Sequence, residues 1–354
     1  MKLIDVCNPK QWKTISASEL VEDGYPVFGA NGIIGYFSDY NHEKPTLCIT
    51  CRGATCGTVN KSLPYSYITG NSMALDDLDE SVITIDFLYY FLQYRGFDDV
   101  ITGSAQPQIT RQSLSKIFIP EIDLNIQKNI TQIIKSLEQL ILNRDKQREN
   151  FNMLVKSRFN EMFGSKKFDK VSISELVDDR IETAKKIFDQ HDTIKYIDIS
   201  SIDNKNYKMT GFQEYMLDQA PSRAQQHIRK GDIVVSTVRP NLKNIAMTEL
   251  DDENLVASSG FCVLRALKCL PEYLFAIICS DRFTNKMTNI VTGANYPAIK
   301  SSDIMNYIVP LPPIQLQNEF ADFVDQVDKS QLAIQKSLEE LETLKKSLMQ
   351  EYFG

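Results

Sequence analysis

Hydrophobic positions recur every three or four residues in two long stretches of this chain. In the first stretch, positions 126, 130, 133, 137, 140, 144, 147, 151, 154 and 158 step by fours and threes, and most are apolar. The second stretch repeats the pattern 190 residues later. A seam of this period over about five heptads is typical of a coiled coil. The predicted seam residues are Ile130, Ile133, Leu137, Leu140, Phe151 and Leu154, and then Phe320, Phe323, Val327, Ile334, Leu341 and Leu344.

A long helix with one apolar stripe needs something to cover that stripe. Burying one Leu or Ile contributes roughly 1.5 to 3 kcal/mol, which over many positions outweighs the cost of ordering the helix. We therefore expect the two helices to cover each other in an antiparallel coiled coil. The alternative is that each helix packs on a globular domain of its own. Prolines at 120 and at 310, 312 and 313 favour an extended segment before each helix.

The two helical stretches belong to a longer internal repeat. At an offset of 190, ITGSAQPQIT (101–110) aligns with VTGANYPAIK (291–300), and the register continues without a gap to the last residue. Upstream of residue 101 the halves resemble each other only loosely, with LIDVCNP (3–9) over ISELVDD (173–179). Two constant segments thus alternate with two variable ones. The repeated residues include Thr102, Gly103, Pro107, Gln127, Leu142 and Leu154, which recur as Thr292, Gly293, Pro297, Gln317, Leu332 and Leu344.

The variable segments combine short strands with one amphipathic helix each. Strands are predicted in TLCITC (46–51), DIVVSTV (232–238) and FCVLRAL (261–267), and helices at 85–95 and 271–283. The predicted fold class is α+β, with two globular strand-rich domains separated by two long helices packed as an antiparallel coiled coil, in a pseudo-two-fold internal repeat. The predicted divisions are 1–118 and 165–310 for the globular domains, and 119–164 and 311–354 for the helices.

Composition and charge narrow the possible partners. With 354 residues, 43% hydrophobic and 24% charged, the chain can build a core and is not wholly disordered. Its net charge of -7 means that any contact with nucleic acid comes from local patches or is shared with a partner. No apolar run reaches the roughly 18 residues of a membrane span, and the start, MKLIDVCNPK, lacks the apolar core of a signal peptide. We expect a cytoplasmic protein with no membrane partner.

Motifs for cofactor chemistry are missing from the sequence. There is no G-x-x-x-x-G-K-[ST], no G-x-G-x-x-G after a strand and no Asn-Pro-Pro-Tyr tetrad. We therefore expect no cofactor and no catalytic residue. Cys48, Cys51 and Cys56 with His42 could in principle hold zinc, but no second Cys-x2-Cys occurs, and strand alternation more simply sends Cys48 and Cys51 to opposite faces. We expect the seven cysteines to be reduced. We also expect no metal site.

Several segments together resemble one family. They are GYPVFGANGIIGY (24–36), RKGDIVVSTVRPNLKNIA (229–246), LPPIQLQNEF (311–320) and the two Thr-Gly-x-x-x-Pro blocks. In these segments and in its repeated helices the chain resembles the specificity (S) subunits of type I restriction-modification systems. The resemblance implies a non-catalytic reader of double-stranded DNA, in which each globular domain is a target recognition domain for one half of a bipartite, asymmetric site.

The same resemblance implies partners and roles for the helices. They would set the spacing between the half-sites and dock two methyltransferase (M) subunits, which carry S-adenosylmethionine, while restriction (R) subunits join the full complex for cleavage. Two other functions remain open at this point: a coiled-coil scaffold with two protein-binding domains, and a fused nuclease or methyltransferase, against which the missing motifs argue.

Polar loops supply the candidates for DNA contact. Arg pairs naturally with guanine and Asn or Gln with adenine, although solvated loops carry the same residue types without reading DNA. Arg52 lies near the place of Arg239 at an offset of about 187, and GANGIIG (29–35) suits either close approach to DNA or a plain hairpin turn. The candidates are Arg52, Asn60, Lys61 and Arg111 in the first domain and Arg223, Gln225, Gln226, Arg229, Arg239, Asn241, Lys243 and Asn244 in the second.

Overall fold

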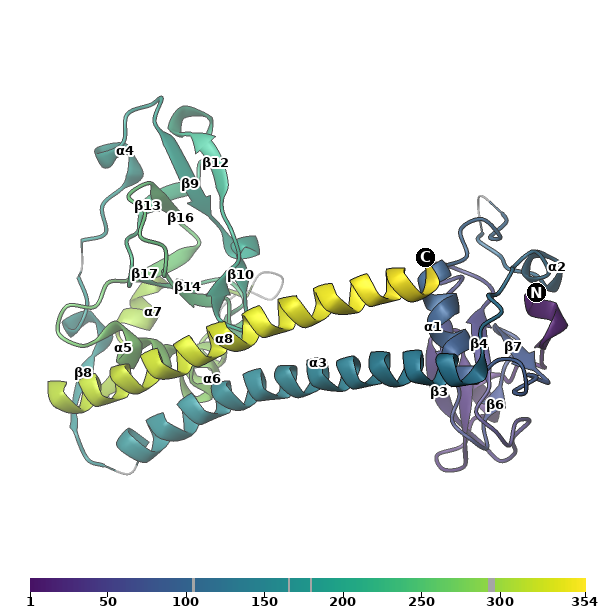
Figure 1. Cartoon of the computed structure of the whole chain (residues 1–354). Helices are drawn as coiled ribbons and strands as arrows, with labels where there is room; N and C mark the ends of the chain where they lie inside the picture. The colour runs from purple at the N-terminus through teal and green to yellow at the C-terminus, as the bar shows by residue number, and fades with distance from the viewer. Residues whose placement is uncertain (104–105, 165, 179, 292–296) are drawn as a thin grey trace. The chain divides into compact units, whose positions relative to one another are not determined.

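The computed structural model describes residues 1–103, 106–164, 166–178, 180–291 and 297–354 (Figure 1). The chain forms two compact units. Unit 1 contains Met1–Lys146 and Ile334–Gly354, and unit 2 contains Gln147–Ala333. Each unit therefore combines a globular part with portions of both long helices, α3 (Leu124–Phe159) and α8 (Ile314–Phe353). Within the described ranges, no helix has the length and apolar character needed to cross a membrane.

Unit 1 is built on an antiparallel sheet of order β1-β7-β4-β5, with a second sheet of order β3-β2-β6 beside it. The predicted strand at 46–51 is confirmed as β4, and its side chains alternate between two cores. Ile49 and Cys51 belong to the main core, and Cys48 belongs to a small core with Phe28. The strands are β1 (Asn8–Gln11), β2 (Tyr25–Gly29), β3 (Gly32–Phe37), β4 (Leu47–Thr50), β5 (Val59–Lys61), β6 (Tyr67–Ile68) and β7 (Ser72–Asp76).

Helix α1 (Ile85–Arg95) covers the main sheet of unit 1. It has the bounds that the hydrophobic pattern predicts, because Thr84 caps its first turn by accepting a hydrogen bond from the Phe87 amide at 3.3 Å. Phe87 and Leu88 are fully buried in the main core. The short helix α2 (Arg111–Leu114) follows the first Thr-Gly-x-x-x-Pro block.

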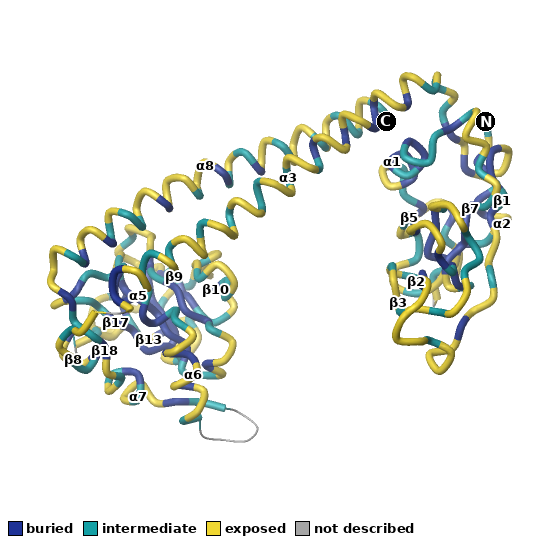
Figure 2. The backbone as a smooth tube through the Cα atoms, turned by 90° about the horizontal axis from the view of Figure 1, so that it is seen from below, coloured by how far each residue is buried: buried dark blue, intermediate teal, exposed yellow. Residues whose placement is uncertain are grey.

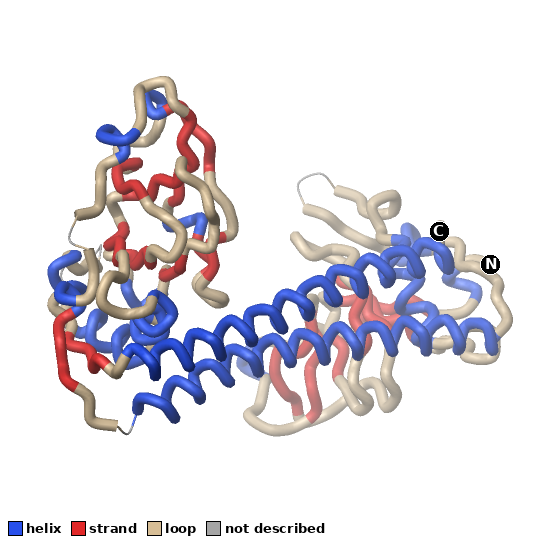
Figure 3. Tube along the Cα trace, turned by 60° about the vertical axis from the view of Figure 1, so that its left-hand side comes forward, coloured by secondary structure: helices blue, strands red, loops and turns tan. Residues whose placement is uncertain are grey.

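Unit 2 contains a three-stranded sheet of order β15-β14-β17 and a larger sheet of order β12-β9-β16-β13, in which β9 and β16 are parallel. The strands are drawn in red in Figure 3. The predicted strands at 232–238 and 261–267 are confirmed as β14 and β17. The strands are β8 (Asp169–Ser172), β9 (Thr193–Ile197), β10 (Ile202–Asp203), β11 (Lys208–Met209), β12 (Gln213–Met216), β13 (Ala224–His227), β14 (Ile233–Ser236), β15 (Ile245–Met247), β16 (Leu255–Ser258), β17 (Phe261–Leu264) and β18 (Ile308–Leu311).

The single helix predicted at 271–283 is wrong, because two helices occupy this region. Helix α5 (Pro271–Ile278) ends before Ser280, and α6 (Asp281–Asn289) begins after it. The Ser280 hydroxyl accepts a hydrogen bond from the Phe283 amide at 3.2 Å, which starts a new helix where the apolar period alone predicts a continuous one. The remaining helices of this unit are α4 (Ala184–Ile187) and α7 (Ser301–Met305).

Both units share a frame that extends well upstream of residue 101. Strands β5-β4-β7 and β15-β14-β17 form the same antiparallel arrangement, with Cys48 opposite Ala74 in one and Val234 opposite Val263 in the other. The loosely matched starts of the two halves also correspond. The Leu3 amide donates to the Ile117 carbonyl, and the Ile173 amide donates to the Tyr307 carbonyl in the same way. Loops of different length between these elements change the offset from one to the next, which hides the frame from an alignment of fixed offset.

The two long helices pack against each other in an antiparallel sense in each unit, as predicted. In unit 1 the Lys345 ammonium of α8 donates to the Glu138 carboxylate of α3 at 2.7 Å. In unit 2 the Gln331 amide of α8 donates to Asn152 of α3 at 2.9 Å. Asn152 lies fourteen residues after Glu138, and Gln331 lies fourteen residues before Lys345, so both contacts fit one antiparallel register.

The buried stripe of the helices corrects the predicted phase of the seam. Figure 2 shows buried and half-buried positions at intervals along α3 and α8. On α3 these include Ile130, Ile134 and Leu137, whereas Ile133 is 41% exposed. The predicted period of three and four residues is right. At several assigned positions the next residue is also apolar, and only packing decides which of the two is buried. Leu140, Leu154 and Leu344 are likewise exposed, while Phe320, Val327 and Ile334 are buried and Phe151, Phe323 and Leu341 are half-buried.

Candidate nucleic-acid interface

In each unit the loop after the central strand pairs with the Thr-Gly-x-x-x-Pro block. In unit 1 the Cys51 carbonyl accepts from the Ile109 amide at 3.0 Å, and the Gly53 amide donates to Pro107 at 3.2 Å. In unit 2 the matching bonds join Thr237 with Ile299 at 2.9 Å and Arg239 with Pro297 at 2.8 Å. Thr292 and Gly293 lie outside the described residues. The repeated block thus fastens a loop that carries candidate residues.

These paired bonds correct the proposed correspondence between Arg52 and Arg239. By these bonds, Arg239 is equivalent to Gly53 and Val238 is equivalent to Arg52. The offset between the two loops is therefore 186 instead of about 187. The isolated bridges agree, since Arg52 faces Gln108 and Val238 faces Ala298. Arg52 and Arg239 therefore stand one position apart in two equivalent loops, and they are not equivalent residues.

Two candidates of the first domain meet in one groove. Arg52 and Arg111, both exposed, line a groove of about 280 Å³ together with Lys10. Neither arginine makes a side-chain hydrogen bond or ion pair within the described part of the chain. The Lys10 ammonium lies over the Trp12 ring, 3.6 Å from its centre.

The other two first-domain candidates are engaged inside the fold. The Asn60 amide donates to the Ala30 carbonyl at 3.3 Å. The Lys61 ammonium lies 2.7 Å from the Asp86 carboxylate, which also pairs with Lys135 of α3. Burial raises the pKa of Asp86, but the hydrogen bonds and charges of Lys135 and Lys61 outweigh it, so this pKa lies below its usual value. Lys61 thus ties β5 to α1.

In the segment 223–230 the candidates differ in how they are engaged. The Gln226 amide donates to the carbonyls of Ser258 and Phe261 at 2.8 and 2.9 Å, which fixes it between strands. Gln225 donates to a neighbouring carbonyl, and Arg229 pairs with Glu182 at 2.7 Å. Arg223 is exposed and, within the described ranges, has no side-chain hydrogen bond or ion pair.

The loop at 238–244 presents two free polar side chains. Arg239 and Asn241 are exposed, and the described residues offer neither a side-chain hydrogen bond nor an ion pair. Asn244 is buried, and Lys243 pairs with Asp281. Burial lowers the pKa of Lys243, but its partners Asp281 and Tyr207 more than reverse this, so the pKa is raised.

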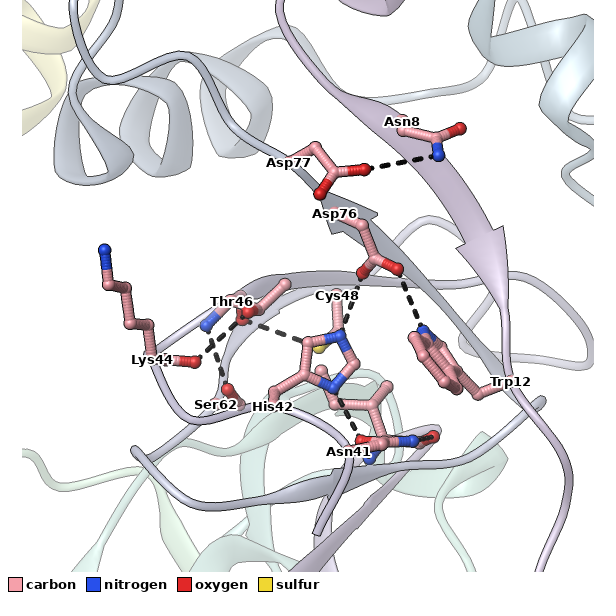
Figure 4. A network of polar contacts seen from close by, with 11 residues as sticks. Asn8, Trp12, Asn41, His42, Lys44, Thr46, Cys48, Ser62, Asp76 and Asp77 are labelled. Atoms are coloured by element: carbon pink, nitrogen blue, oxygen red, sulfur yellow. Dashed lines mark hydrogen bonds and ion pairs between the residues drawn. The ribbon is translucent and has the colours of Figure 1, made fainter.

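The possible zinc ligands take part in ordinary packing. Figure 4 shows His42 between Asp76 and Asn41, with its ring nitrogens 2.9 Å from the Asp76 carboxylate and 2.6 Å from the Asn41 side-chain oxygen. Both ring nitrogens are therefore occupied. Cys48 is buried, which raises the pKa of its thiol to about 12. Within the described ranges, no group of three or more His, Cys, Asp or Glu residues is placed to hold a metal ion.

The segment GANGIIG forms a hairpin, as one of the two interpretations predicted. Strands β2 and β3 pair antiparallel with Gly29 opposite Gly32. Gly32 adopts a φ of +104°, which a residue with a side chain rarely reaches, so this turn requires glycine.

The constant helices expose leucines that the repeat preserves. Leu142 and Leu332 occupy equivalent positions and are 47% and 58% exposed. Leu154 and Leu344 are a second equivalent pair, each 46% exposed. Each unit therefore carries one member of each pair on its helices, outside the buried stripe.

Comparison with known proteins decides the family. The model of the type I restriction modification DNA specificity domain matches residues 1–150 and 165–344. The chain belongs to this family. Its role is therefore DNA sequence recognition in a type I restriction-modification system, as the resemblance of the motifs implied.

Individual relatives agree with this assignment. The chain is 22% identical over 306 residues to the type I restriction enzyme MjaVIII specificity subunit of Methanocaldococcus jannaschii, covering 78% of this chain and 72% of the relative. It is 31% identical over 119 residues to the EcoprrI specificity subunit of Escherichia coli, covering 32% and 29%. The fold resembles the crystal structure of the type I S subunit from M. genitalium, with a TM-score of 0.63, 16% identity and coverage of 100% and 95%.

Proposed function

We propose that this specificity subunit reads a bipartite, asymmetric DNA site, with residues 1–118 and 165–310 acting as target recognition domains for one half-site each. The observation that carries the proposal is the shared frame with unlike additions. Strands β5-β4-β7 and β15-β14-β17 are equivalent, but the second sheet is β3-β2-β6 in unit 1 and β12-β9-β16-β13 in unit 2. Different surfaces on a common frame are what reading two different half-sites requires, because each base pair presents its own pattern in the major groove.

The exposed, unpaired candidates are the side chains most suited to contact DNA in this proposal. Their donors remain available, whereas Lys61, Gln226 and Lys243 donate to groups within the fold. Each bidentate contact to a base would contribute roughly 1 to 3 kcal/mol of discrimination. The side chains whose donors have no partner among the described residues are Arg52, Arg111, Arg223, Arg239 and Asn241.

The helices at 119–164 and 311–354 are proposed to set the spacing and to dock two copies of a methyltransferase subunit. The repeated exposed leucines support two equal docking sites, since each unit presents one residue of the Leu142/Leu332 pair and one of the Leu154/Leu344 pair. A single exposed leucine needs no partner, so the support comes from its recurrence at equivalent positions in both copies of the repeat. The chain itself would be non-catalytic, with methylation and cleavage carried out by the methyltransferase and restriction subunits.

Methylation sequencing tests the proposal directly. A strain with the wild-type chain should show one bipartite methylated motif, which disappears when the gene is deleted and returns on complementation. Replacing residues 1–118 with the corresponding segment of another specificity subunit should change one half of the motif and leave the other half intact. A change in both halves would contradict modular reading, and an unchanged methylome after deletion would favour the scaffold alternative.

A further inference from the structure

Three tyrosines of unit 1 gather in one surface cluster. Tyr25 begins β2, Tyr40 follows β3 and Tyr65 precedes β6. The centre of the Tyr40 ring lies 4.8 Å from that of Tyr25 and 5.3 Å from that of Tyr65, and both pairs are edge-to-face. Tyr25 is 38% exposed, Tyr65 is 52% exposed and Tyr40 is half-buried. We call these three residues the tyrosine cluster.

Hydrogen bonds fix the backbone around the tyrosine cluster. The His42 amide donates to the Ser66 carbonyl and the Ser66 amide donates to the His42 carbonyl, both at 3.0 Å. These bonds hold the segments that carry two of the tyrosines side by side. The Asn41 side chain donates to the Ile68 carbonyl at 3.0 Å and accepts from the Ile68 amide at 2.8 Å. A surface that is ordered in advance loses less entropy when a ligand binds.

Tyr65 has a backbone conformation that suits glycine better than tyrosine. Its φ is +52°, in the left-handed region that disfavours a residue with a Cβ. Its amide donates to the Glu43 carbonyl at 3.1 Å, which holds it there. Because the Tyr65 ring is exposed, burial in a core does not account for this strain. Strained residues cluster at functional sites, so the exposed ring is a candidate for a contact.

Two carboxylates lie beside the tyrosine cluster. Desolvation raises the pKa of the Tyr40 hydroxyl, and Glu43, the two other tyrosines and Asp39 raise it further. Asp39 and Glu43 are exposed, and neither makes an ion pair with any residue that the structure describes. Within the same ranges, no lysine or arginine lies over any of the three rings. The cluster thus combines aromatic faces with negative charge and lacks a cation of its own.

The chain around the tyrosine cluster is acidic. Residues 14–43 contain five carboxylates and neither lysine nor arginine, so that the nearest cations in the sequence are Lys13 and Lys44. A surface of this charge repels the phosphates of DNA, and it therefore suits a protein partner better than a duplex. Tyrosine is also enriched among the residues that contribute most to protein–protein binding.

We propose that the tyrosine cluster is a docking site for an arginine side chain of a partner protein. A guanidinium group stacks on tyrosine rings and pairs with carboxylates, and the cluster offers both. Arginine fits better than lysine, because its planar group can do both at once. The inference goes beyond the proposed function, since the contact needs no DNA.

The site belongs to the first domain alone. Two of the tyrosines stand on or next to strands of the β3-β2-β6 sheet, Tyr25 on β2 and Tyr65 before β6. Unit 2 carries a different sheet, β12-β9-β16-β13, in place of this one. We therefore expect one arginine site per chain.

An NMR titration of the full chain tests the proposal. The 15 tyrosines carry carbon-13 in their rings, and the variants Y25F, Y40F and Y65F assign the resonances of the cluster. The probe is the peptide acetyl-Gly-Leu-Arg-Leu-Gly-amide. The control peptide contains citrulline, which has nearly the shape of arginine but no charge. The arginine peptide should shift the three assigned rings, and the citrulline peptide should bind at least about fivefold more weakly.

Substitutions in the cluster separate the aromatic faces from the charge. Y40F keeps an aromatic face and should bind the arginine peptide like wild type, whereas Y40L should bind it about two- to fivefold more weakly. E43Q removes one charge, so it should weaken binding and reduce its dependence on salt. Y36L removes an exposed tyrosine of β3 outside the cluster and should leave the affinity unchanged. Circular dichroism checks folding, and if Y40L does not fold, E43Q and the citrulline peptide still decide.

Three results would overturn the inference. The first is equal affinity for the arginine and citrulline peptides, and the second is unchanged affinity in E43Q and in folded Y40L. The third is a shift of the three rings by duplex DNA with the methylated motif but not by the peptide, which would make the cluster part of the DNA contact. The peptide titration does not depend on methylation, so these failures leave the proposed function intact.

Discussion

Gly53 and Arg239 occupy the same backbone position in the two halves of the chain. Each donates its amide to the proline of the Thr-Gly-x-x-x-Pro block, and each has a positive φ, +86° for Gly53 and +49° for Arg239. Gly57 and Lys243 form a second such pair, with φ of +92° and +53°. The second domain thus holds two cationic side chains in a conformation for which the first domain uses glycine.

Because glycine would adopt this backbone conformation more easily, we predict that the side chain of Arg239 has a function. The left-handed conformation costs a residue with a Cβ about 1 to 2 kcal/mol, and glycine avoids that cost but loses roughly 0.5 to 1 kcal/mol of chain entropy. R239G should therefore leave the free energy of unfolding within about 1 kcal/mol of wild type, whereas R239A should be less stable than R239G. Urea unfolding measures both.

The same two variants separate stability from recognition. Both lack the guanidinium group, so both should weaken binding of the motif duplex to the same extent in the assembled complex. If R239G binds DNA as well as wild type does, Arg239 has no role in DNA contact and only its backbone conformation matters.

Gln127 and Gln317 are predicted to be essential joints between helix and domain. The Gln127 side chain, 1% exposed, accepts from the Thr84 amide at 2.8 Å and donates to the carbonyls of Val82 and Ile122. Gln317 bonds in the same way to Leu270 and Pro312. Q127A leaves three half-buried backbone groups without this partner and should lower the free energy of unfolding by about 2 kcal/mol.

The matched control for this joint is Q132A, which removes an exposed amide on the same helix. It should change stability by less than about 0.5 kcal/mol. Equal stability of Q127A and Q132A in a thermal or urea unfolding series would contradict the assigned role.

Tyr90 is predicted to make unit 1 sensitive to alkali. Its hydroxyl donates to the Glu138 carboxylate at 2.7 Å, and burial first, then this hydrogen bond and charge, raise its pKa well above the usual value of 10.0. A raised folded-state pKa means that the stabilisation is complete below pH 10 and is lost as the pH rises further, by up to about 1.4 kcal/mol per pH unit.

Comparison with Y90F isolates this contribution. The variant keeps the ring but has no proton to lose, so its stability should fall less between pH 10 and 11 than that of wild type, while other tyrosines contribute equally to both. Parallel pH curves for the two proteins in urea unfolding would show that Tyr90 ionises as freely in the folded state as in the unfolded one.

The exposed leucines are predicted to determine how many methyltransferase subunits assemble. The double variant L142E/L344E changes only exposed residues of unit 1, and L154E/L332E changes the equivalent residues of unit 2. Native mass spectrometry should find one methyltransferase copy with either variant and two with wild type. N150E, an exposed polar position on α3, serves as the control. Two copies bound to both double variants would exclude these leucines as docking residues.

The paired helices are predicted to act as a ruler. Seven residues inserted after Lys146 and seven after Lys336 preserve the heptad phase of both helices and lie opposite each other in the antiparallel register. The insertion adds about 10.5 Å, close to three base pairs. Methylation sequencing should show a lengthened spacer or no methylation. An unaltered motif would mean that the helices do not determine the spacing.

The sequence by itself determined the elements whose signal is local or periodic. The repeat at offset 190, the long helices and α1 follow from patterns that neighbouring residues carry. The family also followed from motifs read together. The same kind of evidence could not separate Ile133 from Ile134 on α3, because both are apolar and only tertiary packing decides that Ile134 enters the main core of unit 1.

Tertiary structure decided what depends on partners distant in the chain. The break between α5 and α6 and the position of Arg239 opposite Pro297 rest on single hydrogen bonds that no hydrophobic period records. Lys61 has the chemistry of a DNA-contacting residue, but its ammonium donates to Asp86, 25 residues away in the chain. The groove that Arg52 and Arg111 line exists only because the Ile109 amide bonds to the Cys51 carbonyl, which brings two segments that are distant in the chain together.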